Sequence, residues 1–380
     1  MSTTIIISIT LILAIVFGTI LIPNVVRLSH KLHLYDVPDH RKIHKLPIPR
    51  LAGTVFLPTV TIVITLILVI LLRLGNTDDN IWKNTSDINH FMAYIAGVMM
   101  IYSIGLYDDL IGVSYKIKFI VQILAATILC ISGLWIADFS HVFFIDKVPW
   151  WIGMPITILS VTYITNATNL IDGIDGLASG LCIIALAVLA SLNYILGYTL
   201  CAMLSVAMLG VLLPFFYFNV FGRKDKTFMG DAGSLTLGFT ISFLILHFWQ
   251  RNPVWDARFH NVGIVAISTF IIPMFDVVRV MLSRIRDHRD PFLPDKNHIH
   301  HKLLRTGIGA KMTMVILLLI SIFFITFNYF TAAYLSQTIM LISDIVLFCI
   351  THIIINIFIY KEETKTGIKW SRIFKQYIIF

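Results

Sequence analysis

The first charged side chain of this sequence is Arg27, so the segment from Thr4 to Val26 is an uncharged and largely apolar run. About 20 apolar residues in a helix cross the hydrocarbon core of a bilayer, and this run is longer. No basic residue precedes it and no small-residue cleavage site follows, which predicts a retained span rather than a removed secretory signal. Only 13% of the 380 residues are charged, against roughly 25% in a soluble domain. The chain is therefore expected to be an integral membrane protein.

Apolar runs recur along the whole chain and predict an all-α bundle of eleven transmembrane spans. The weakest division lies between the sixth and seventh spans, where only residues 197–199 interrupt the run, so ten spans with one irregular hairpin are the alternative. The predicted spans are residues 4–26, 51–74, 91–107, 119–136, 149–168, 177–196, 200–221, 232–249, 261–281, 312–334 and 338–360.

The basic residues of the loops predict the orientation. Alternate loops carry 24 Lys and Arg on one side of the membrane and 5 on the other, and the basic side is assigned to the cytoplasm. The N-terminus is then on the outer side of the membrane and the C-terminus on the cytoplasmic side. The net charge of +8 follows from this topology, so nucleic acid is excluded as a partner. The cytoplasmic loops of this single transmembrane domain, residues 1–360, are 27–50, 108–118, 169–176, 222–231 and 282–311.

Two further features carry less information. The basic tail, residues 361–380, has apolar side chains at roughly helical spacing, which fits an amphipathic helix on the inner leaflet and a disordered tail equally well. The four cysteines all fall inside apolar runs and lack the spacing of metal ligands, so packed free thiols are expected.

Asp108 and Asp109 lie side by side in GLYDDLIG, at the end of the third predicted span. Two adjacent carboxylates at a membrane boundary repel each other unless a cation or a proton-transfer role balances them. A solvated loop start explains the pair equally well. The pair alone does not decide between a site and a surface.

A second acidic segment, NATNLIDGIDGLASG, places Asn166, Asn169, Asp172 and Asp175 three residues apart, which predicts that they share one side of a helix end. The glycines between them let the backbone approach a ligand closely. Helix capping needs one side chain, whereas this segment offers four. The segment therefore favours a surface for Mg²⁺ and a polar nucleotide.

Asp231 lies between two glycines in FMGDAGSLTLGF, at the start of the eighth predicted span. Asp and Ser also cap helices, an interpretation of equal weight for this segment alone. A hard cation draws carboxylates from separate loops, and two other acidic segments are predicted on the same face. That context favours a metal ligand.

His298, His300 and His301 follow one another in PDKNHIHHKLLRTG, among lysines and an arginine. Zinc is one interpretation, but paired zinc ligands on helices favour an i,i+4 spacing and no cysteine accompanies these histidines. Binding of phosphate fits the surrounding cations better. A basic cytoplasmic loop explains the cations but not the histidines.

A fifth segment, RKIHKLPIPRLAG, contains Arg50 in a basic turn that its prolines stiffen, and a positive-inside loop explains it equally well. All five segments are predicted on the cytoplasmic side. Together they supply carboxylates for a divalent cation and cations for pyrophosphate oxygens at a lipid boundary. The predicted chemistry is transfer of a phosphoryl centre to a lipid acceptor.

In these motifs the sequence resembles the polyprenyl-phosphate N-acetylhexosamine-1-phosphate transferases, membrane enzymes that begin bacterial surface-glycan assembly. The resemblance covers nearly the whole chain through the ordered set DD, NxxNxxDGxDG, FMGDxGS and HxHH. It implies that a UDP-N-acetylhexosamine and undecaprenyl phosphate give undecaprenyl-pyrophosphate-sugar and UMP, with Mg²⁺, or Mn²⁺ as a substitute. HxHH preceded by PD implies GlcNAc-1-phosphate. Three consecutive histidines are typical of the branch that acts on UDP-MurNAc-pentapeptide, which is the alternative.

The resemblance also implies roles for single residues. Asp231 becomes a metal ligand with Asn169 as the second, and Asp108 becomes the base or orienting group for the lipid phosphate, with Asp109 as its partner. The implied substrate-binding residues are Asn166, Asp172, Asp175, Phe228, His298, His300, His301 and Arg50, with Asp172, Asp175 and Phe228 on the uridine side.

Two departures from the family pattern are visible. The family's PRxGG is PRLAG here, and the loop between Asn219 and Asp231 is longer than usual.

An ionised lipid phosphate needs little help from a base, so direct attack is favoured over an aspartyl-phosphate intermediate. The downstream polymer, cell-wall or lipopolysaccharide, and the oligomeric state, a homodimer included, stay open.

Two other classes of function rank lower. A cation- or proton-coupled transporter needs acids near the bilayer midplane, and only Asp276, which can pair with Arg279, and Asp344 lie within predicted spans away from the motifs. A non-catalytic lipid-binding scaffold does not require so many aspartates facing one pocket.

Overall fold

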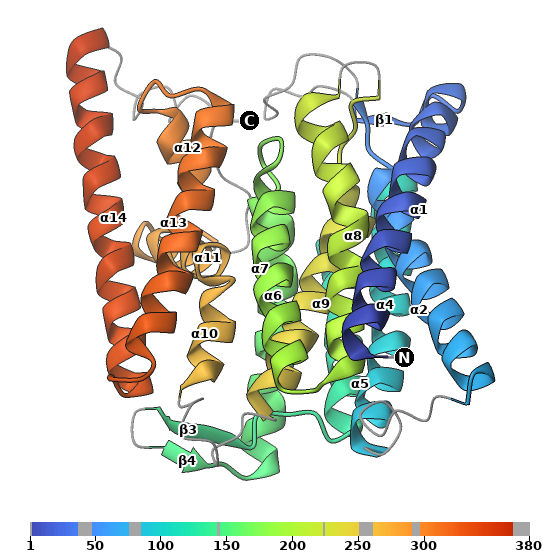
Figure 1. The fold of residues 1–380 in the computed structure, drawn as a ribbon. Coiled ribbons are helices and arrows are strands. Elements are labelled where there is room, and N and C mark those ends of the chain that lie inside the picture. Colours follow the sequence, from blue (N-terminus) through green and yellow to red (C-terminus); the bar gives the residue numbers. More distant parts are fainter. Residues whose placement is uncertain are drawn as a thin grey trace.

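The computed structural model describes residues 2–36, 48–75, 85–142, 145–222, 225–250, 261–290 and 297–367. Long helices run between two ends of the molecule, called here the upper end, where α12 lies, and the lower end, where β3 and β4 lie (Figure 1). The helices of the first half are α1 (Thr3–Lys31), η1 (Ala52–Val55), α2 (Phe56–Arg73), α4 (Thr85–Ile111), α5 (Tyr115–Ile131), α6 (Trp150–Ile171) and α7 (Leu177–Ile195). Those of the second half are α8 (Thr199–Phe221), α9 (Gly230–Gln250), α10 (Val262–Ser268), α11 (Ile271–Arg286), α12 (Ile299–Leu304), α13 (Ala310–Thr331) and α14 (Gln337–Thr366).

The strands of the described residues form two small antiparallel pairs, one at each end of the bundle. At the upper end β1 (Tyr35–Asp36) pairs with β2 (Ile48–Pro49), and at the lower end β3 (Asp138–Val142) pairs with β4 (Ile145–Lys147) (Figure 1). Both pairs connect helices, and each supplies a buried apolar side chain, Ile48 from β2 and Val142 from β3.

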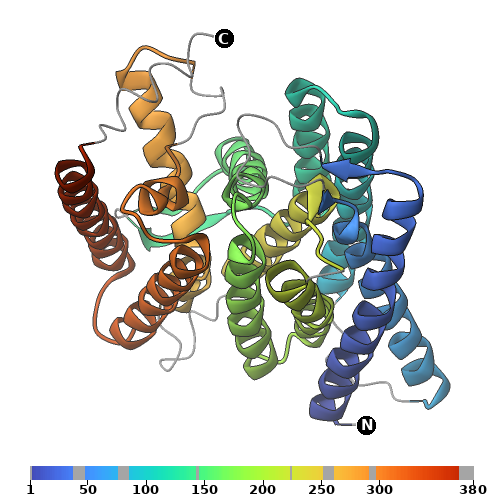
Figure 2. The same cartoon turned by 90° about the horizontal axis from the view of Figure 1, so that it is seen from above.

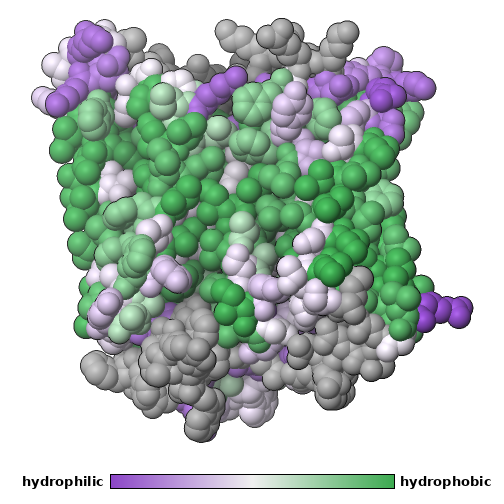
Figure 3. Space-filling view, viewed as in Figure 1, coloured by the Kyte–Doolittle hydropathy of each residue, from purple (hydrophilic) through white to green (hydrophobic). Residues whose placement is uncertain are grey.

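Eight helices of the described chain are long and apolar enough to cross a membrane, which agrees with an all-α, multi-pass membrane protein. Figure 3 shows a broad hydrophobic belt around the middle of the molecule, with hydrophilic residues gathered at the upper corners. The predicted total of eleven spans and the orientation of the termini stay predictions. The predicted amphipathic tail from residue 368 onward lies outside the described residues.

Helix α9 occupies the centre of the bundle. It packs against α4, α6, α7, α8 and α10, and its residues from Ala232 to Phe248 are all buried. A helix that is apolar on every side must be enclosed by other helices. Seen from above, α10 to α14 lie on one side of α6 and α7, while α1, α2, α4 and α5 lie on the other (Figure 2). The start of α9 therefore lies between these two groups of helices.

The division between the sixth and seventh predicted spans is confirmed as two helices. α7 ends at Ile195 and α8 begins at Thr199, with Gly197 at φ +78° in the turn between them. Glycine tolerates this left-handed conformation because it has no Cβ.

The ninth predicted span, 261–281, is not one continuous helix in the structure. The helix is interrupted at Thr269 and Phe270, between α10 and α11. Pro273, in the first turn of α11, has no N–H to donate to the carbonyl of Thr269, which favours an interruption at this point. After the break, α11 begins as a separate helix.

All four cysteines are free, as predicted, but their expected packing holds for only three. Cys130, Cys182 and Cys201 are buried, whereas Cys349 is exposed on α14. The polarisable thiol of Cys349 lies on a helix whose outer side is largely apolar and open, as expected for a surface that meets lipid.

Candidate active site

Asp109, at the end of α4, holds the beginning of α9. Its two carboxylate oxygens accept hydrogen bonds from the backbone N–H groups of Asp231 and Ala232, each at 2.9 Å. These N–H groups lie in the first turn of α9, where no intrahelical acceptor is available and a negative charge is favoured. Asp109 is only 5% exposed. Asp109 thereby positions Asp231, and its predicted catalytic role stays a prediction.

Glycines permit this close approach of backbone to backbone. A Cβ on Gly105 of α4 would lie 2.6 Å from the Cα of Ala232, and a Cβ on Gly53 would overlap the carbonyl of Met229. Gly53 also donates a backbone hydrogen bond to that carbonyl. In the departure from PRxGG, the position that needs glycine is still glycine, while Ala52 is accommodated in the buried turn η1.

Arg50 secures the same junction from the other side. Its guanidinium donates to the carbonyl oxygens of Asp108 and Asp109, which lie in the last turn of α4. A cation at a helix C-terminus is favourable because the last carbonyls lack helical donors. The predicted role of Arg50 in substrate binding stays a prediction, and its observed contact is a structural one.

Asp108 and Asp231 share one ammonium group. The Nζ of Lys118, in the first turn of α5, lies 2.8 Å from Asp231 Oδ2 and 3.3 Å from Asp108 Oδ2. All three side chains are about one-fifth exposed, so the cluster is open to a ligand on one side. The other Asp108 oxygen, Oδ1, accepts a hydrogen bond from the N–H of Val113 at 2.8 Å. Three helices thus converge on one group of charges.

Asn169 of α6 completes this cluster. Its amide nitrogen donates to Asp231 Oδ1 at 3.0 Å and to Ser234 Oγ at 2.9 Å. The two donor contacts keep the Asp231 carboxylate in place on its side opposite Lys118. The predicted pairing of Asn169 with Asp231 is therefore present as a contact.

The expected shared helical face of the NxxNxxDGxDG segment is only partly formed. Asn166 lies within α6, but its amide pairs with Gln122 of α5 and donates to Thr162 O at 2.8 Å, away from the charge cluster. α6 ends at Ile171, so Asp172 and Asp175 fall in the turn that follows. The helix ends there because Gly173 and Gly176 follow in quick succession, and Gly176 adopts φ +78°.

Asp172 nevertheless belongs to the acidic site. Desolvation by the surrounding protein, and then the negative charges of neighbouring carboxylates, raise the pKa of Asp172 to about 7, although the residue remains accessible to solvent. The carboxylates that act on it are those of Asp231, Asp175 and Asp109. Asp172 is therefore electrostatically coupled to the acidic site.

The segment before α9 is tied to the same turn. Lys226 Nζ lies 2.7 Å from Asp175 Oδ2, and Asn219 accepts from the N–H of Gly176 at 2.6 Å while donating to Thr227 O at 2.8 Å. Asn219 is buried and uses both ends of its amide within the protein. Phe228 is partly buried and its N–H donates to Pro49 O at 2.8 Å. A nucleotide role of Asp175 and Phe228 stays a prediction.

The histidine motif is organised by a residue of α11. Asp276 accepts hydrogen bonds from His298 Nδ1 at 2.9 Å and from the N–H of Ile299 at 3.0 Å, and it pairs with Arg279 at 2.7 Å. The predicted pairing of Asp276 with Arg279 is confirmed. Because a carboxylate only accepts, Nδ1 carries the proton of His298 and Nε2 is left for another partner.

His300 is buried against the turn that follows α6. It is 1% exposed, and a Cβ on Gly173 would overlap its Nε2. Burial, followed by the neighbouring imidazoles of His301 and His298, holds the pKa of His300 well below its usual value, so the ring is neutral. Neither ring nitrogen of His300 has a hydrogen-bond partner among the described residues. A buried imidazole in this state is suited to a polar ligand.

The structure thus brings together most of the residues predicted for the site. The charge cluster contains Asp108, Asn169 and Asp231, with Asp109 behind it and Asp172 beside it. His298, His300 and His301 form a second group, with His300 and His301 rings 4.2 Å apart, which meets the first group through Gly173. Asn166 points elsewhere.

Sequence reasoning missed three charged residues that the site uses, namely Lys118, Lys226 and Asp276. Lys118 and Lys226 had been counted only as positive-inside charges, and Asp276 only as a partner of Arg279. Each makes its decisive contact with a residue more than 20 positions away in sequence. The one signal that the sequence offered for these residues was a charged side chain close to the end of a predicted span.

Comparison with known proteins places this arrangement in a family. The family model described as glycosyl transferase family 4 matches residues 91–248. A Bacillus subtilis (strain 168) protein named probable undecaprenyl-phosphate N-acetylglucosaminyl 1-phosphate transferase is 32% identical over 308 residues, 80% of this chain and 79% of that protein. The undecaprenyl-phosphate alpha-N-acetylglucosaminyl 1-phosphate transferases of Yersinia pestis and Escherichia coli (strain K12) are 30% identical, covering 77% and 82% of this chain and 75% and 80% of their own lengths.

Proposed function

The chain belongs to glycosyl transferase family 4, and from this premise we propose that it transfers N-acetylglucosamine 1-phosphate from a UDP-sugar to undecaprenyl phosphate. The products are undecaprenyl-pyrophosphate-sugar and UMP. The names of the relatives support the sugar and the lipid. They favour this function over transfer of the MurNAc-pentapeptide group and over transport.

One observation carries the proposal. Asp231, Asp108 and Lys118 converge from three helices at one end of a membrane bundle, next to an apolar groove. Phosphoryl transfer relies on positioned charges more than on covalent chemistry by the protein. A lipid acceptor requires those charges at the boundary between water and hydrocarbon.

The groove supplies a path for the lipid. Its walls come from α4 and α5, and it measures about 400 Å³. The lining residues are Met99, Met100, Ser103, Ile104, Tyr107 and Val121. Ile104 lies one helical turn before Asp108, so the groove and the Asp108 carboxylate share one face of α4. A polyprenyl chain lying in this groove would bring its phosphate to Asp108 and Lys118.

The donor groups around Asp231 fit Mg²⁺. Magnesium prefers oxygen ligands and is usually held by one or two carboxylates plus substrate phosphates. Asp231 and Asp108 offer carboxylate oxygens around the position of an ammonium group, which is already a site for a cation. Asn169 would contribute its amide oxygen only after a flip, because its nitrogen now donates to Asp231. Bound there, Mg²⁺ would neutralise charge on the donor pyrophosphate.

The protein's own residues then account for the reaction. An oxygen of the ionised lipid phosphate attacks the β-phosphorus of the UDP-sugar, and the bond from that phosphorus to the bridging oxygen breaks, so UMP leaves with the electron pair. Lys118 holds the incoming phosphate beside Asp108, which orients it. His298 and His300 donate to or accept from oxygens of the sugar phosphate, and Asp172 and Asp175 face the nucleoside.

This proposal includes a location. The upper end faces the cytoplasm of a bacterial inner membrane, where a UDP-sugar is available, and the N-terminus lies outside. The excess of Lys and Arg in the loops of that face supports this orientation. A homodimer is compatible with it and is not required by the chemistry.

Purified protein with undecaprenyl phosphate, Mg²⁺ and a panel of UDP-sugars tests the function through UMP release. UDP-N-acetylglucosamine should be the best donor. Asp231→Asn should lower kcat by a factor of about 10³ or more. The matched control is Asp287→Asn, an exposed aspartate after α11 that pairs with Arg289, and it should leave the rate unchanged. The assignment fails if no sugar releases UMP or if Asp231→Asn has wild-type activity.

A further inference from the structure

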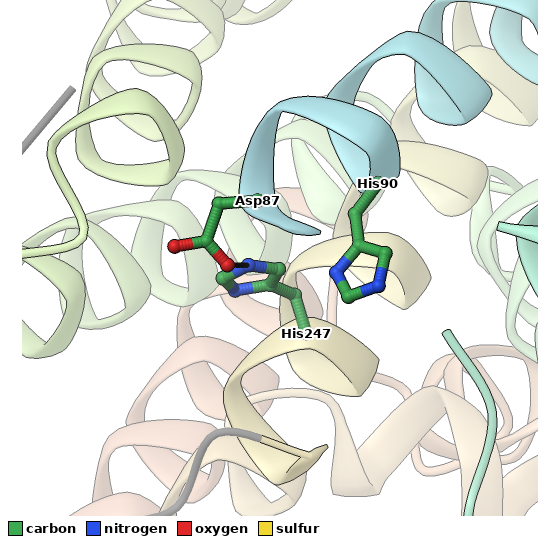
Figure 4. Close-up of side chains that lie close together, drawn as sticks. All are labelled: Asp87, His90 and His247. Atoms are coloured by element: carbon green, nitrogen blue, oxygen red, sulfur yellow. Dashed lines mark hydrogen bonds and ion pairs between the residues drawn. The ribbon is translucent and has the colours of Figure 1, made fainter. Parts of the chain in front are cut away.

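A second cluster of titratable residues lies at the lower end of the bundle, away from the site described above. Asp87 and His90 occupy the first turns of α4, and His247 occupies the last turn of α9. Figure 4 shows the Asp87 carboxylate and the His90 ring on α4 facing the His247 ring. One ligand atom from each residue lies within 4.8 Å of the other two.

The contacts of His247 define how this cluster is built. Its Nε2 lies 3.2 Å from Asp87 Oδ1, and its ring centroid lies 5.8 Å from that of His90 in an edge-to-face arrangement. Its Nδ1 lies 3.5 Å from the Sγ of Cys201, on the opposite side of the ring. Nε2 is therefore the atom that faces the cluster, and Cys201 fixes the ring from behind.

Burial distinguishes this cluster from a surface group. His90 is 4% exposed and His247 is 1% exposed, while the Asp87 side chain is 17% exposed. An Asp–His ion pair alone explains two of the three residues. It gives no reason for a second buried imidazole to stand with its ring against the pair.

We propose that Asp87, His90 and His247 form a zinc site. Two imidazole nitrogens and one carboxylate oxygen are a ligand set that Zn²⁺ uses, with a water as the fourth ligand. Imidazole suits zinc, whereas magnesium and calcium prefer oxygen donors alone. Zinc–ligand bonds of about 2.0–2.2 Å place ligand atoms closer together than 4.8 Å, so side-chain rotations must draw them inward. Asp87, near a helix start and partly exposed, has room to rotate.

The Cys201 contact fits this role. A ring nitrogen that ligates a metal is usually oriented by a hydrogen bond made by the other ring nitrogen. The Nδ1–H of His247 can donate to Cys201, which leaves the lone pair of Nε2 directed at the cluster. With both Nε2 and the carboxylate then acting as acceptors, a cation between them removes their repulsion.

The zinc site would join the helices that also carry the acidic site. α4 carries Asp87 near its start and Asp109 near its end, and α9 carries Asp231 near its start and His247 near its end. The two clusters lie about 30 Å apart along these helices, at 1.5 Å of rise per residue. The ion would link the lower ends of α4 and α9 and stabilise their packing without taking part in catalysis.

Zinc titration of the full-length, EDTA-treated protein in detergent tests the proposal. Competition with a chromogenic chelator measures affinity and stoichiometry, a thermal shift measures stabilisation, and Co²⁺ absorption reports the coordination geometry. We expect one Zn²⁺ per chain, a higher thermal midpoint with zinc, a tetrahedral Co²⁺ spectrum, and no comparable effect of Mg²⁺ at this site.

His90→Gln is the most informative variant because it leaves the Asp87–His247 pair intact. It should weaken zinc binding by a factor on the order of 100 or more while the protein stays folded without zinc. His247→Gln and Asp87→Asn should also lose the site. His30→Gln, which alters an exposed histidine at the upper end, and Asp231→Asn should bind zinc like the wild type. The proposal is overturned if zinc does not bind, or if binding survives His90→Gln and is lost in His300→Gln instead.

Discussion

Asp109 accepts a hydrogen bond from the backbone N–H of Asp231 and so sets the position of this proposed metal ligand. Its neighbour Asp108 is the residue proposed to orient the lipid phosphate. The two adjacent aspartates of α4 therefore face different tasks. Asp109 is directed at the α9 backbone, and Asp108 is directed at Lys118. Substitution should separate a structural contribution from a chemical one.

Asp109→Asn should lower stability as well as activity. An amide keeps one acceptor oxygen but turns an NH₂ group toward the second backbone N–H, which loses its acceptor. Leaving one buried donor unsatisfied costs about 1–3 kcal/mol. The thermal midpoint of the detergent-solubilised protein should fall, together with kcat, because Asp231 is no longer held.

Asp108→Asn is the matched variant. Its amide oxygen can still accept from Val113, so the thermal midpoint should stay close to that of the wild type. The rate of UMP release should fall by a factor of about 10²–10⁴. The opposite result, loss of stability in Asp108→Asn alone, would mean that the two roles are reversed.

Lys118→Met should change the magnesium dependence. The ammonium neutralises Asp108 and Asp231, so its removal makes the site more negative and should draw the divalent cation in more strongly. We expect the half-saturating Mg²⁺ concentration to fall about tenfold, equivalent to about 1.4 kcal/mol. kcat should fall at the same time, because Lys118 no longer holds the lipid phosphate.

Lys118→Arg keeps the positive charge and should keep the magnesium dependence of the wild type. Mg²⁺ titration of UMP release in the three proteins measures both effects. A higher magnesium requirement in Lys118→Met would contradict the view that the ammonium and the metal respond to the same carboxylates.

Substitutions of Asp276 and His298 should likewise separate an effect on stability from an effect on activity. Asp276→Asn should cost about 3–5 kcal/mol, because Arg279 would lose its carboxylate in a largely buried position. In His298→Asn the new amide can still donate to Asp276, so the fold should persist while the imidazole is lost. We expect near-normal thermal stability and a large decrease in kcat for His298→Asn, measured by thermal unfolding and UMP release. Wild-type stability in Asp276→Asn would show that this carboxylate does not organise the histidine motif.

The helices of the fold could be predicted because a bilayer demands long apolar runs, and such runs are visible without tertiary information. The interruption at Thr269 and Phe270 could not be located by hydropathy, since residues 270–275 after it are as apolar as residues 262–267 before it. Pro273 was a local signal for it, because the missing proline N–H removes the hydrogen bond that a continuous helix would make to the carbonyl of Thr269.

The candidate site was predictable in composition and less so in geometry. The DD pair and the segment that contains Asp231 were recognised from their motifs. Their division of labour depends on which helix each carboxylate faces, and Asp108 and Asp109 differ by one position, about 100° around α4. Lys118 and Asp276 were missed because their partners are brought together only by helix packing.

Deprotonation of Lys302, a lysine of the histidine motif PDKNHIHHKLLRTG, should lower the rate of the transfer reaction at alkaline pH. Partial burial, and then the positive charges of Arg279 and Arg305, lower its pKa to about 8. Lys302 is charged below that pH and neutral above it, so a contribution to phosphate binding is lost as the pH rises. We expect kcat/KM for the UDP-sugar to decrease above pH 8. Lys302→Arg should move this limit to higher pH, and Lys311→Arg, at the start of α13, should not.

The contribution of Lys302 to folding stability should move the other way over the same range, so its titration gives no reason for alkaline unfolding. In the unfolded chain a lysine keeps its proton up to about pH 10.4. Between about pH 8 and 10.4 the unfolded state therefore binds more protons at Lys302 than the folded state does, so this residue makes the free energy of unfolding increase with pH. Thermal midpoints measured beside kcat/KM at each pH test both signs. A limit near pH 8 that persists unchanged in Lys302→Arg would assign the alkaline loss to another group.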